Sequence, residues 1–348
     1  MHRVVILIAA LAALPVDAGA LGPARDRSTA RDGAVSVERQ RQRDGEGREQ
    51  QTERTTRTLK LGPRGEIHLG NIAGDITISR GSGGDAALEI VKVARGRSAE
   101  DAKELLNLVQ VEVTERGPRA EVKTRYPHDQ EGRRHGRRNF DVSVSYNLTA
   151  PEGTRVSASS ISGSVSVKDI KGDVALESVS GSVRIANAGR VAAAKSISGS
   201  VEIFDTQIDG ALEASSVSGR VLVRGVKAHS VEAGAVSGDV LVQDVSCQRL
   251  EAQTVSGAVQ FAGDLARGGR YELSSHSGDV KVTIAGNTGF EVEATSFSGS
   301  VRTDIPLQSD IDDEARGPRR RTVRGVHGDG SAILDLTTFS GGIVITRR

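Results

Sequence analysis

Tryptophan is absent from the 348 residues of the chain, aromatic residues make up 3% of it, and cysteine occurs once, at Cys247. A single thiol cannot form an intrachain disulfide, so packing and hydrogen bonds must hold the fold. The scarcity of aromatic rings counts against an enzyme that stacks sugar rings along a cleft. A net charge of +1 provides no overall field that would attract nucleic acid or a membrane. We therefore predict no nucleic-acid partner.

Motifs that carry known chemistry are missing as well. No pair of histidines has the His-Glu-x-x-His spacing of a zinc site, and neither a Gly-x-Ser-x-Gly elbow nor a P-loop occurs. The Gly-x-Gly-x-x-Gly dinucleotide pattern is not found between a strand and a helix. We therefore predict no catalytic residue, no metal site and no cofactor, and we expect a protein that is not an enzyme.

Only one long apolar run is present, and it lies near the first residue. Residues 1–20 combine a basic Arg3, an apolar core from Val4 to Val16 and the small residues Ala18-Gly19-Ala20, which is the pattern of a cleavable signal peptide. The apolar core is too short to span a membrane, so we predict no transmembrane anchor in the mature chain. The expected location is the periplasm, the cell surface or the extracellular space.

Two segments follow the signal peptide and precede the main body of the sequence. Residues 21–54 are rich in Arg, Glu, Gln, Asp and Gly, which predicts a disordered linker. Residues 55–150 contain strand-like runs and one helix, with Ser98 as its N-cap and Asp101 at the capping-box position. We interpret residues 55–150 as a β-rich N-terminal cap that covers an open sheet edge, and residues 71–78 within it already resemble a repeat unit.

Glycine and serine, by contrast, are abundant and regularly spaced. The pattern Ser-x-Ser-Gly, or a close variant, occurs nine times between residues 151 and 348, and its glycines are 18 to 21 residues apart except for a last interval of 42. These glycines are Gly163, Gly181, Gly199, Gly219, Gly238, Gly257, Gly278, Gly299 and Gly341. A nearly fixed period of this length is typical of a solenoid built from stacked repeats.

Each repeat contains two short strands. Two and four residues after the glycine stand β-branched residues such as Val183 and Ile185, and apolar residues rich in alanine stand five and seven residues before it. Strands of about five residues cannot bury a core alone, but copies paired in parallel about 4.8 Å apart form continuous columns. The sequence therefore predicts an all-β fold, a parallel β-solenoid in which Val183, Val201 and Val221 lie above one another. Val191 stands one place early, which predicts a bulge.

Two corners are expected in each repeat. At the first corner we expect the glycine to adopt a positive φ and the serine before it to bond the backbone or the next serine in the stack. The second corner, six residues later, has Asp169, Asn187, Asp205 and Asp244 among its members. Its alternation of acidic and neutral residues disfavours a calcium ladder. His276 stands in a column otherwise filled by Val, Ile and Phe, and we interpret it as a partly exposed corner residue.

Two basic loops are the best local candidates for contact with an anion or a glycan. One lies in the cap, and the other lies in an insertion at residues 307–328, which explains the interval of 42. Their candidate contact residues are Arg133, Arg134, Arg137, Arg138, Arg319, Arg320 and Arg321. The alternative interpretation is that both are solvated surface loops without a ligand.

From about residue 55 onward, the sequence resembles a bacterial putative-adhesin domain family of unknown function. The resemblance lies in Gly-Asn-Ile-Ala-Gly-Asp-Ile at Gly70–Ile76, in Tyr-Asn-Leu-Thr-Ala-Pro at Tyr146–Pro151, in the serial Ser-Gly repeats and in the closing Thr-Phe-Ser-Gly-Gly-Ile-Val-Ile. It implies a β-solenoid fold and an adhesive role, and it supplies no catalytic residues.

Three functions are compatible with this pattern. The first is an exported non-catalytic adhesin or scaffold that binds a cell-envelope polysaccharide or a surface protein. The second is a polysaccharide lyase or hydrolase on the same fold, although the outward residues Arg184 and Glu202 fit a surface ion pair better than a catalytic pair. The third is a filament subunit that stacks through a terminal strand at Gly342–Thr346, which Arg347 and Arg348 disfavour.

Overall fold

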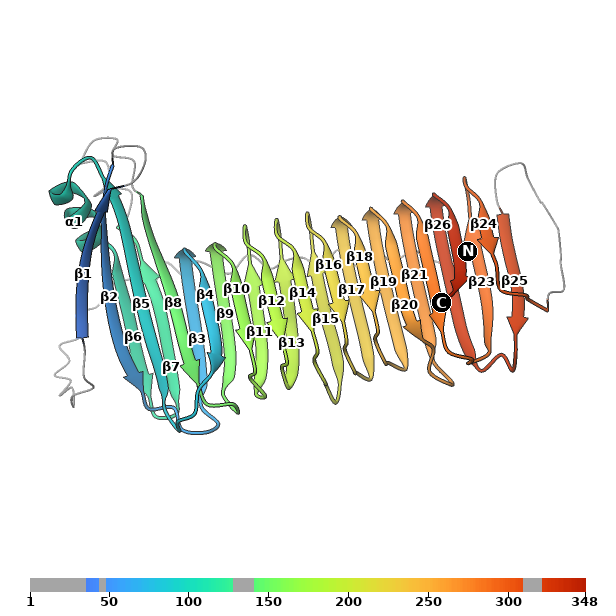
Figure 1. Cartoon of the computed structure of the whole chain (residues 1–348), viewed down its shortest axis with the longest axis horizontal. Helices are drawn as coiled ribbons and strands as arrows, with labels where there is room; N and C mark the ends of the chain where they lie inside the picture. Colours follow the sequence, from blue (N-terminus) through green and yellow to red (C-terminus); the bar gives the residue numbers. More distant parts are fainter. Residues whose placement is uncertain (1–35, 44–47, 128–140, 309–320) are drawn as a thin grey trace, which may run out of the picture. The chain divides into compact units, whose positions relative to one another are not determined.

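The computed structural model describes residues 36–43, 48–127, 141–308 and 321–348, all of which belong to one compact unit, Ala34–Arg348. The predicted signal peptide, residues 1–20, lies outside the described residues. The described chain is almost entirely β-structure, arranged in two sheets (Figure 1).

Sheet A contains 14 strands and sheet B contains 13. In spatial order, sheet A consists of β1 (Ser36–Arg43), β2 (Glu49–Leu59), β5 (Ala86–Gly96), β8 (Val142–Ala150), β4 (Ile76–Arg80), β10 (Val165–Lys168), β12 (Val183–Ala186), β14 (Val201–Phe204), β16 (Val221–Arg224), β18 (Val240–Gln243), β20 (Val259–Asp264), β22 (Val280–Ala285), β27 (Ile343–Arg347) and β24 (Val301–Thr303). Sheet B consists of β25 (Arg321–His327), β23 (Phe290–Ser296), β26 (Ala332–Ser340), β21 (Arg270–Ser277), β19 (Arg249–Ser256), β17 (Ser230–Ser237), β15 (Ala211–Ser216), β13 (Arg190–Ser196), β11 (Asp173–Ser178), β9 (Arg155–Ser162), β3 (Glu66–Ala73), β7 (Arg119–Arg125) and β6 (Gln110–Arg116). Neighbours pair in parallel from β8 to β24 and from β7 to β23, and the remaining pairs are antiparallel.

The repeats stack in register, which confirms the predicted parallel β-solenoid. Val183 pairs with Val201, Val201 pairs with Val221, and all three side chains are fully buried. Alanine fills the facing column of sheet B, where Ala214 is 1% exposed, so the interior between the sheets is narrow. The predicted bulge is also present, because the register between β11 and β13 shifts just after Val191.

The glycines of the first corner are required for a reason other than the predicted positive φ. Of the nine, only Gly257 has a φ in the positive range, at 158°. A Cβ atom on Gly199 would instead lie 2.1 Å from the carbonyl oxygen of Gly181 one rung earlier. The backbones of successive rungs therefore approach too closely at this corner for any side chain.

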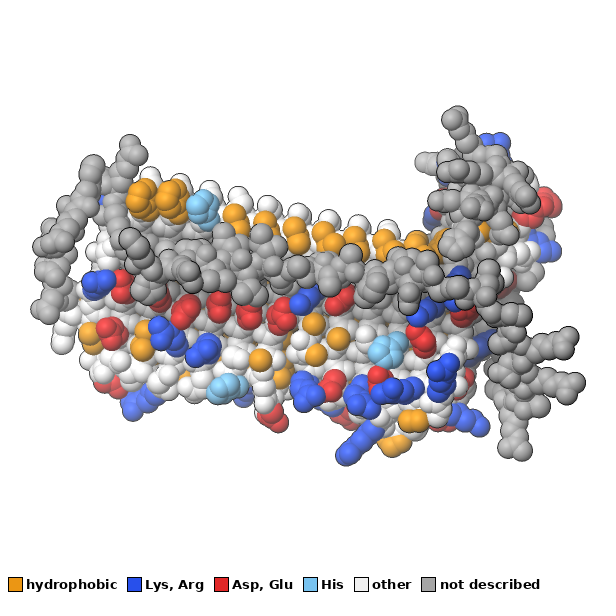
Figure 2. Space-filling view, turned by 180° about the vertical axis from the view of Figure 1, so that it is seen from behind, with side chains coloured by type: hydrophobic (Ala, Val, Ile, Leu, Met, Phe, Trp, Pro, Cys, Tyr) orange, Lys and Arg blue, Asp and Glu red, His pale blue; other side chains and the backbone are white. Residues whose placement is uncertain are grey.

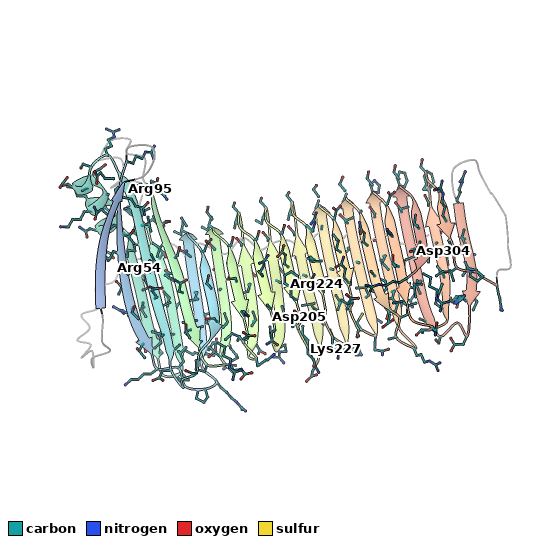
Figure 3. The ribbon with its side chains drawn as sticks, viewed as in Figure 1. Arg54, Arg95, Asp205, Arg224, Lys227 and Asp304 are labelled. Atoms are coloured by element: carbon teal, nitrogen blue, oxygen red, sulfur yellow. The ribbon has the colours of Figure 1, made fainter. Side chains whose placement is uncertain are left out.

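The left-handed residues lie at the second corner. They are Asp169, Asn187, Asp205 and Asp244, with φ between 46° and 60° (Asp205 is labelled in Figure 3). Asn and Asp tolerate this region better than other non-glycine residues, which explains their recurrence at this position.

The first serine or threonine of the pattern, rather than the second serine, joins neighbouring rungs in seven of the nine repeats; Ala235 has no hydroxyl group, and the Oγ of Ser160 has no hydrogen-bond partner. Ser196 is 2% exposed, and its Oγ donates to the carbonyl oxygen of Gly181 at 2.9 Å and accepts from the N–H of Gly199 at 2.9 Å. The equivalent donor bond to a glycine of the adjacent rung is made by Ser178, Ser216, Thr254, Ser275, Ser296 and Thr338. The second serine of the pattern is exposed.

The N-terminal cap contains one rung of the stack, because β3 pairs in parallel with β9 and β4 pairs in parallel with β10. The predicted helix is α1 (Ala99–Leu108), which packs against β2 and β5. The Oγ of Ser98 accepts from the N–H of Asp101 at 3.2 Å, as predicted for its N-cap. Leu105 and Leu106 form its buried face.

The predicted C-terminal boundary of the disordered linker, residues 21–54, is wrong, because two strands begin before residue 54. Strand β1 lies within that range, and β2 begins within it and pairs with β5 from Glu49 to Leu59. A polar composition does not prevent this pairing, because the ladder bonds come from the backbone and an antiparallel sheet tolerates one polar face.

The last rungs stack out of chain order. Strand β26 lies between β21 and β23, and β27 lies between β22 and β24 (Figure 1). Leu336 of β26 accordingly pairs with Leu273 on one side and with Ala294 on the other. Residues 342–346, predicted as a terminal strand through which filaments stack, therefore lie inside sheet A with both neighbours in place. This position contradicts the proposed stacking through that strand.

The predicted loop insertion at residues 307–328 is also partly wrong. Its residues 321–327 form β25, which pairs antiparallel with β23. The backbones of Gln308 and Val326 exchange two further hydrogen bonds. Charged residues gave β25 the composition of a loop, but Arg321 and Arg324 are exposed on the edge strand of sheet B, where charges are common.

Candidate binding surface

The first corner of the stack carries a row of exposed apolar side chains. The first serine of Ser-x-Ser-Gly points inward, so the middle residue projects outward. These middle residues form the apolar ridge, which in stacking order consists of Ile72, Ile161, Val179, Ile197, Val217, Val236, Val255, His276, Phe339 and Phe297. Figure 2 shows this row along one edge of the stack.

The apolar ridge holds most of the large apolar side chains that are exposed in the described part of the chain. Within the described part of the chain, the only large apolar side chains of comparable exposure outside the ridge are Leu108 and Ile333. Exposure along the ridge reaches 51% at Ile161 and 47% at Phe339. Ile197 and Val255 are half-buried, and the other apolar members of the ridge are exposed. Single exposed apolar residues are common, but a row of them is a candidate contact surface.

A row of hydroxyl groups runs beside the apolar ridge. It consists of the second serines of the pattern, which are Ser162, Ser180, Ser198, Ser218, Ser237, Ser256, Ser277, Ser298 and Ser340, all exposed. Because each rung contributes one apolar side chain and one hydroxyl, both rows repeat about every 4.8 Å.

Three rings stack at one end of the apolar ridge. The centroids of His276 and Phe339 lie 4.9 Å apart with planes inclined by 9°, and those of Phe339 and Phe297 lie 4.7 Å apart with planes inclined by 7°. Phe339 lies between the other two because its rung is inserted out of chain order. His276 is exposed at the corner, as predicted.

The outer face of sheet B carries an acidic column that sequence reasoning missed. Consecutive strands place in register Glu213, Glu232, Glu251, Glu272, Asp335 and Glu293. Burial raises the pKa of Glu251, and the charges of Glu232 and Glu272 raise it further. Burial also raises the pKa of Asp335, assisted by Glu272 and Glu293. The sequence contained this pattern, because an acidic residue stands six positions before the glycine of the last six repeats.

Basic residues neutralise part of the acidic column. Lys195 lies 2.6 Å from Glu213, and Arg270 lies 2.8 Å from Glu272. Exposed pairs of this kind contribute at most about 1 kcal/mol each. Within the described ranges, no group of three or more His, Cys, Asp or Glu side chains is arranged to hold a metal ion.

Two shallow recesses lie at the second corner, away from the apolar ridge. The first has a volume of about 480 Å³ and is lined by Arg64, Gly153, Arg155, Lys171, Gly172 and Asp173. The second, of about 540 Å³, is lined by residues that include His229, Arg249 and Arg270. Both are therefore predominantly cationic.

Most of the predicted anion-contact residues lie outside the described residues. These are Arg133, Arg134, Arg137, Arg138, Arg319 and Arg320. Arg321 is described; it is the exposed first residue of β25 and is paired in register with Ser296 of β23. A contact between these arginines and a glycan or another anion remains a prediction.

The ion pair of Arg184 and Glu202 and the single thiol of Cys247 both lie in surroundings that fit a structural role. Arg184 forms the expected ion pair, with its Nε 2.9 Å from Glu202, and it shares the ring of Phe204 with Arg224 (labelled in Figure 3). Cys247 is buried, and burial raises the pKa of its thiol to about 11, so it is not a reactive thiolate at neutral pH.

A two-sheet stack of short parallel rungs with one ridge of exposed apolar residues defines a β-solenoid repeat protein with a linear contact surface. The chain belongs to the Toastrack DUF4097 family, whose model matches residues 32–346. No curated protein is significantly similar to it. No helix among the described residues is both long enough and apolar enough to cross a membrane.

Several solved bacterial structures are similar to the chain at low identity. A putative adhesin from Bacteroides fragilis is 14% identical, with 85% of this chain and 97% of that chain covered and a TM-score of 0.39. A putative lipid binding protein from Parabacteroides distasonis is 13% identical, with 85% and 96% covered and a TM-score of 0.39. A putative cell adhesion protein from Clostridium sporogenes is 10% identical, with 84% and 99% covered and a TM-score of 0.21.

Proposed function

We propose that this protein is an exported, non-catalytic binding protein of the cell envelope that contacts an extended, uncharged polysaccharide along the apolar ridge. The observation that carries the proposal is the pairing of one apolar row with one hydroxyl row over successive rungs. Sugar rings offer an apolar C–H face and hydroxyl edges, and aromatic side chains such as Phe297 and Phe339 suit the apolar face. His276 is the only titratable side chain on the ridge, which favours an uncharged partner.

The test is a pull-down of the purified protein with insoluble neutral polysaccharides and with peptidoglycan. A triple variant, Val179→Ser, Val217→Ser and Val236→Ser, removes apolar surface from the centre of the ridge without touching the core. We expect it to fold normally and to lose at least about tenfold in affinity, because several apolar contacts are lost together. The matched control, Leu108→Ser with Ile333→Ser, removes apolar side chains that are equally exposed but lie off the ridge. Unchanged binding by the triple variant would remove the ridge from the proposal.

A polysaccharide lyase or hydrolase is the second candidate, and the acidic column favours it. Neighbouring strands place its carboxylates about 4.8 Å apart in the backbone, close to the separation of roughly 5 Å in retaining glycosidases. The raised pKa of Glu251 is also what a general acid requires. The column lies on an open sheet face, however, and the recess nearest to it is shallow and lined by Arg249 and Arg270 rather than by its carboxylates. Turnover of any member of a polysaccharide panel, lost in Glu251→Gln, would reverse this ranking.

A further inference from the structure

The first recess gathers cations from three separate segments of the chain. Arg64 comes from the turn between β2 and β3, Arg155 is the first residue of β9, and Lys171 lies in the corner between β10 and β11. We call these three residues the cationic recess. Figure 2 shows Lys and Arg side chains gathered on the side of the stack away from the apolar ridge.

The carboxylates near the cationic recess are already engaged by other cations. Arg190 binds Asp173 through two contacts, Nε to Oδ1 at 2.7 Å and a terminal nitrogen to Oδ2 at 2.8 Å. Glu66 contacts His68 at 2.7 Å and Arg119 at 3.0 Å, and these neighbours lower its pKa, with the hydrogen bond to His68 as the largest cause. Arg155 lies farther from Glu66, at 3.6 Å.

Of the three cations of the recess, Arg155 shares Glu66 with His68 and Arg119, whereas Lys171 and Arg64 form no ion pair with a carboxylate in the described ranges. The Nζ of Lys171 donates to the side-chain oxygen of Asn187 at 2.6 Å and to its carbonyl oxygen at 3.2 Å. The amide nitrogen of Asn187 in turn donates to Asp169 at 2.6 Å, which fixes the orientation of the amide. Arg64 forms no ion pair with any residue in the described ranges.

Two glycines of the lining lie where backbone segments approach closely. A Cβ atom on Gly172 would lie 2.2 Å from the carbonyl oxygen of Thr154, and one on Gly153 would lie 2.6 Å from that of Pro63. Neither position therefore accepts a side chain. The lining has three cationic side chains and one carboxylate, that of Asp173, so positive charge is in surplus.

We propose that the cationic recess binds a phosphate group, either free or carried by a lipid or glycan. A phosphate group has up to two negative charges and three oxygens to share among three cations, whereas a carboxylate has one charge and two oxygens. The guanidinium groups of Arg64 and Arg155 match phosphate oxygens in pairs, and Lys171 supplies a point charge. The site lies at the second corner and does not depend on a ligand on the apolar ridge.

The experiment uses the full protein with three probes at constant ionic strength. The probes are inorganic phosphate, vesicles of phosphatidylcholine that contain phosphatidic acid, and vesicles of phosphatidylcholine alone as a blank. Calorimetry measures inorganic phosphate, and vesicle co-sedimentation measures the lipid. The test variant is Arg64→Gln with Lys171→Gln, and the matched control is Lys281→Gln with Arg302→Gln, which removes the same two charge types from exposed positions on sheet A.

We expect the wild type and the control to bind at least one phosphate probe equally well. We expect the test variant to lose roughly tenfold or more in affinity, because it lacks two of the three cations that would form charge-assisted hydrogen bonds to the phosphate oxygens. Binding of inorganic phosphate alone identifies free phosphate as the ligand, and binding of the phosphatidic acid vesicles identifies a headgroup. Equal losses in test and control variants, or no binding of either phosphate probe by the wild type, would overturn the proposal.

Discussion

At the residue scale, the spacing between rungs depends on one glycine in each first corner and, in most of these corners, on one hydroxyl group. The carbonyl oxygen of Gly181 lies where a side chain of Gly199 would have to be, and the hydroxyl of Ser196 satisfies that same oxygen. The first serine and the glycine of the Ser-x-Ser-Gly pattern are therefore packing requirements, and its middle residue and second serine are free to contact a partner.

Gly199→Ala should destabilise the protein by about 2 kcal/mol or more, because a methyl group 2.1 Å from a carbonyl oxygen forces the rungs apart. The control is Gly234→Ala, whose Cβ would meet nothing closer than 3.9 Å and should leave stability unchanged or slightly increased. Urea unfolding followed by circular dichroism measures both. Equal midpoints for the two variants would show that the close approach is not limiting.

The hydroxyl column contains a natural gap, because Ala235 occupies the position held elsewhere by Ser or Thr. Ser196→Ala should cost about 1–3 kcal/mol, since it leaves the oxygen of Gly181 and the N–H of Gly199 without this partner. Ala235→Ser should have the opposite sign and add about 1 kcal/mol. The unfolding midpoints of the two variants, measured under the same conditions, test these two predictions. A loss of stability in both variants would contradict the role of the hydroxyl group.

At the scale of the strand, the acidic column of sheet B places like charges directly across neighbouring strands. The raised pKa of Glu251 means that the folded state binds its proton more tightly than the unfolded chain does. The ordinary pKa of a glutamate side chain is 4.5, and the contribution of Glu251 to stability falls as the pH rises above that value. The contribution recovers as the pH falls through the raised pKa of the folded state.

Glu251→Gln should accordingly be more stable than the wild type at pH 7, by up to about 1 kcal/mol, because it removes a partly desolvated charge and its repulsion with Glu232 and Glu272. The advantage should disappear near pH 4, where the wild-type carboxyl group is protonated. The control is Glu202→Gln on sheet A, which loses an ion pair to Arg184 and should gain nothing at pH 7. Thermal unfolding across this pH range measures both, and a pH-independent advantage would count against charge as the cause.

Of the columns formed by stacked strands, the sequence predicted the buried ones but not the exposed acidic one. The columns that contain Val183 and Val201 were predictable, because β-branched residues at a fixed offset from glycine have few alternatives to a buried strand. The acidic column follows an equally fixed offset, but residues on an outer face vary, so only the paired register shows that Glu232, Glu251 and Glu272 are neighbours.

The order of the last rungs was not predictable from the repeats. Every rung has the same apolar columns and the same corner glycine, so each fits against any other, and chain order is the natural assumption. The contact residues Arg133 and Arg319 illustrate a different limit, because their segments have charge but no periodic pattern that would fix their place. The cationic recess was missed for a third reason, since Arg64, Arg155 and Lys171 are far apart in the sequence.

At the scale of the whole molecule, the inserted rung makes two distant segments depend on each other. Truncation after Gly330 removes β26 and β27, and with them the parallel neighbours of β23 and β24. We expect residues 290–308 and 321–327 to lose protection from hydrogen exchange, whereas the rungs up to β22 keep most of theirs. Removal of Arg348 alone, which lies beyond β27, is the control and should change little. Full protection of residues 290–296 in the truncated chain would show that β23 can close the stack directly on β21.

This arrangement also constrains how the protein is made. A polypeptide that emerges from its N-terminus can add rungs one by one as far as β22, but the segment from residue 290 to residue 327 then has no lasting place to dock. Strand β23 can pair with β25 within that segment, but β23 and β24 gain their parallel neighbours only when β26 and β27 arrive and insert between them and the earlier rungs. A pause in synthesis at that point would leave β21 and β22 as open parallel edges, which could pair with another chain until β26 and β27 insert.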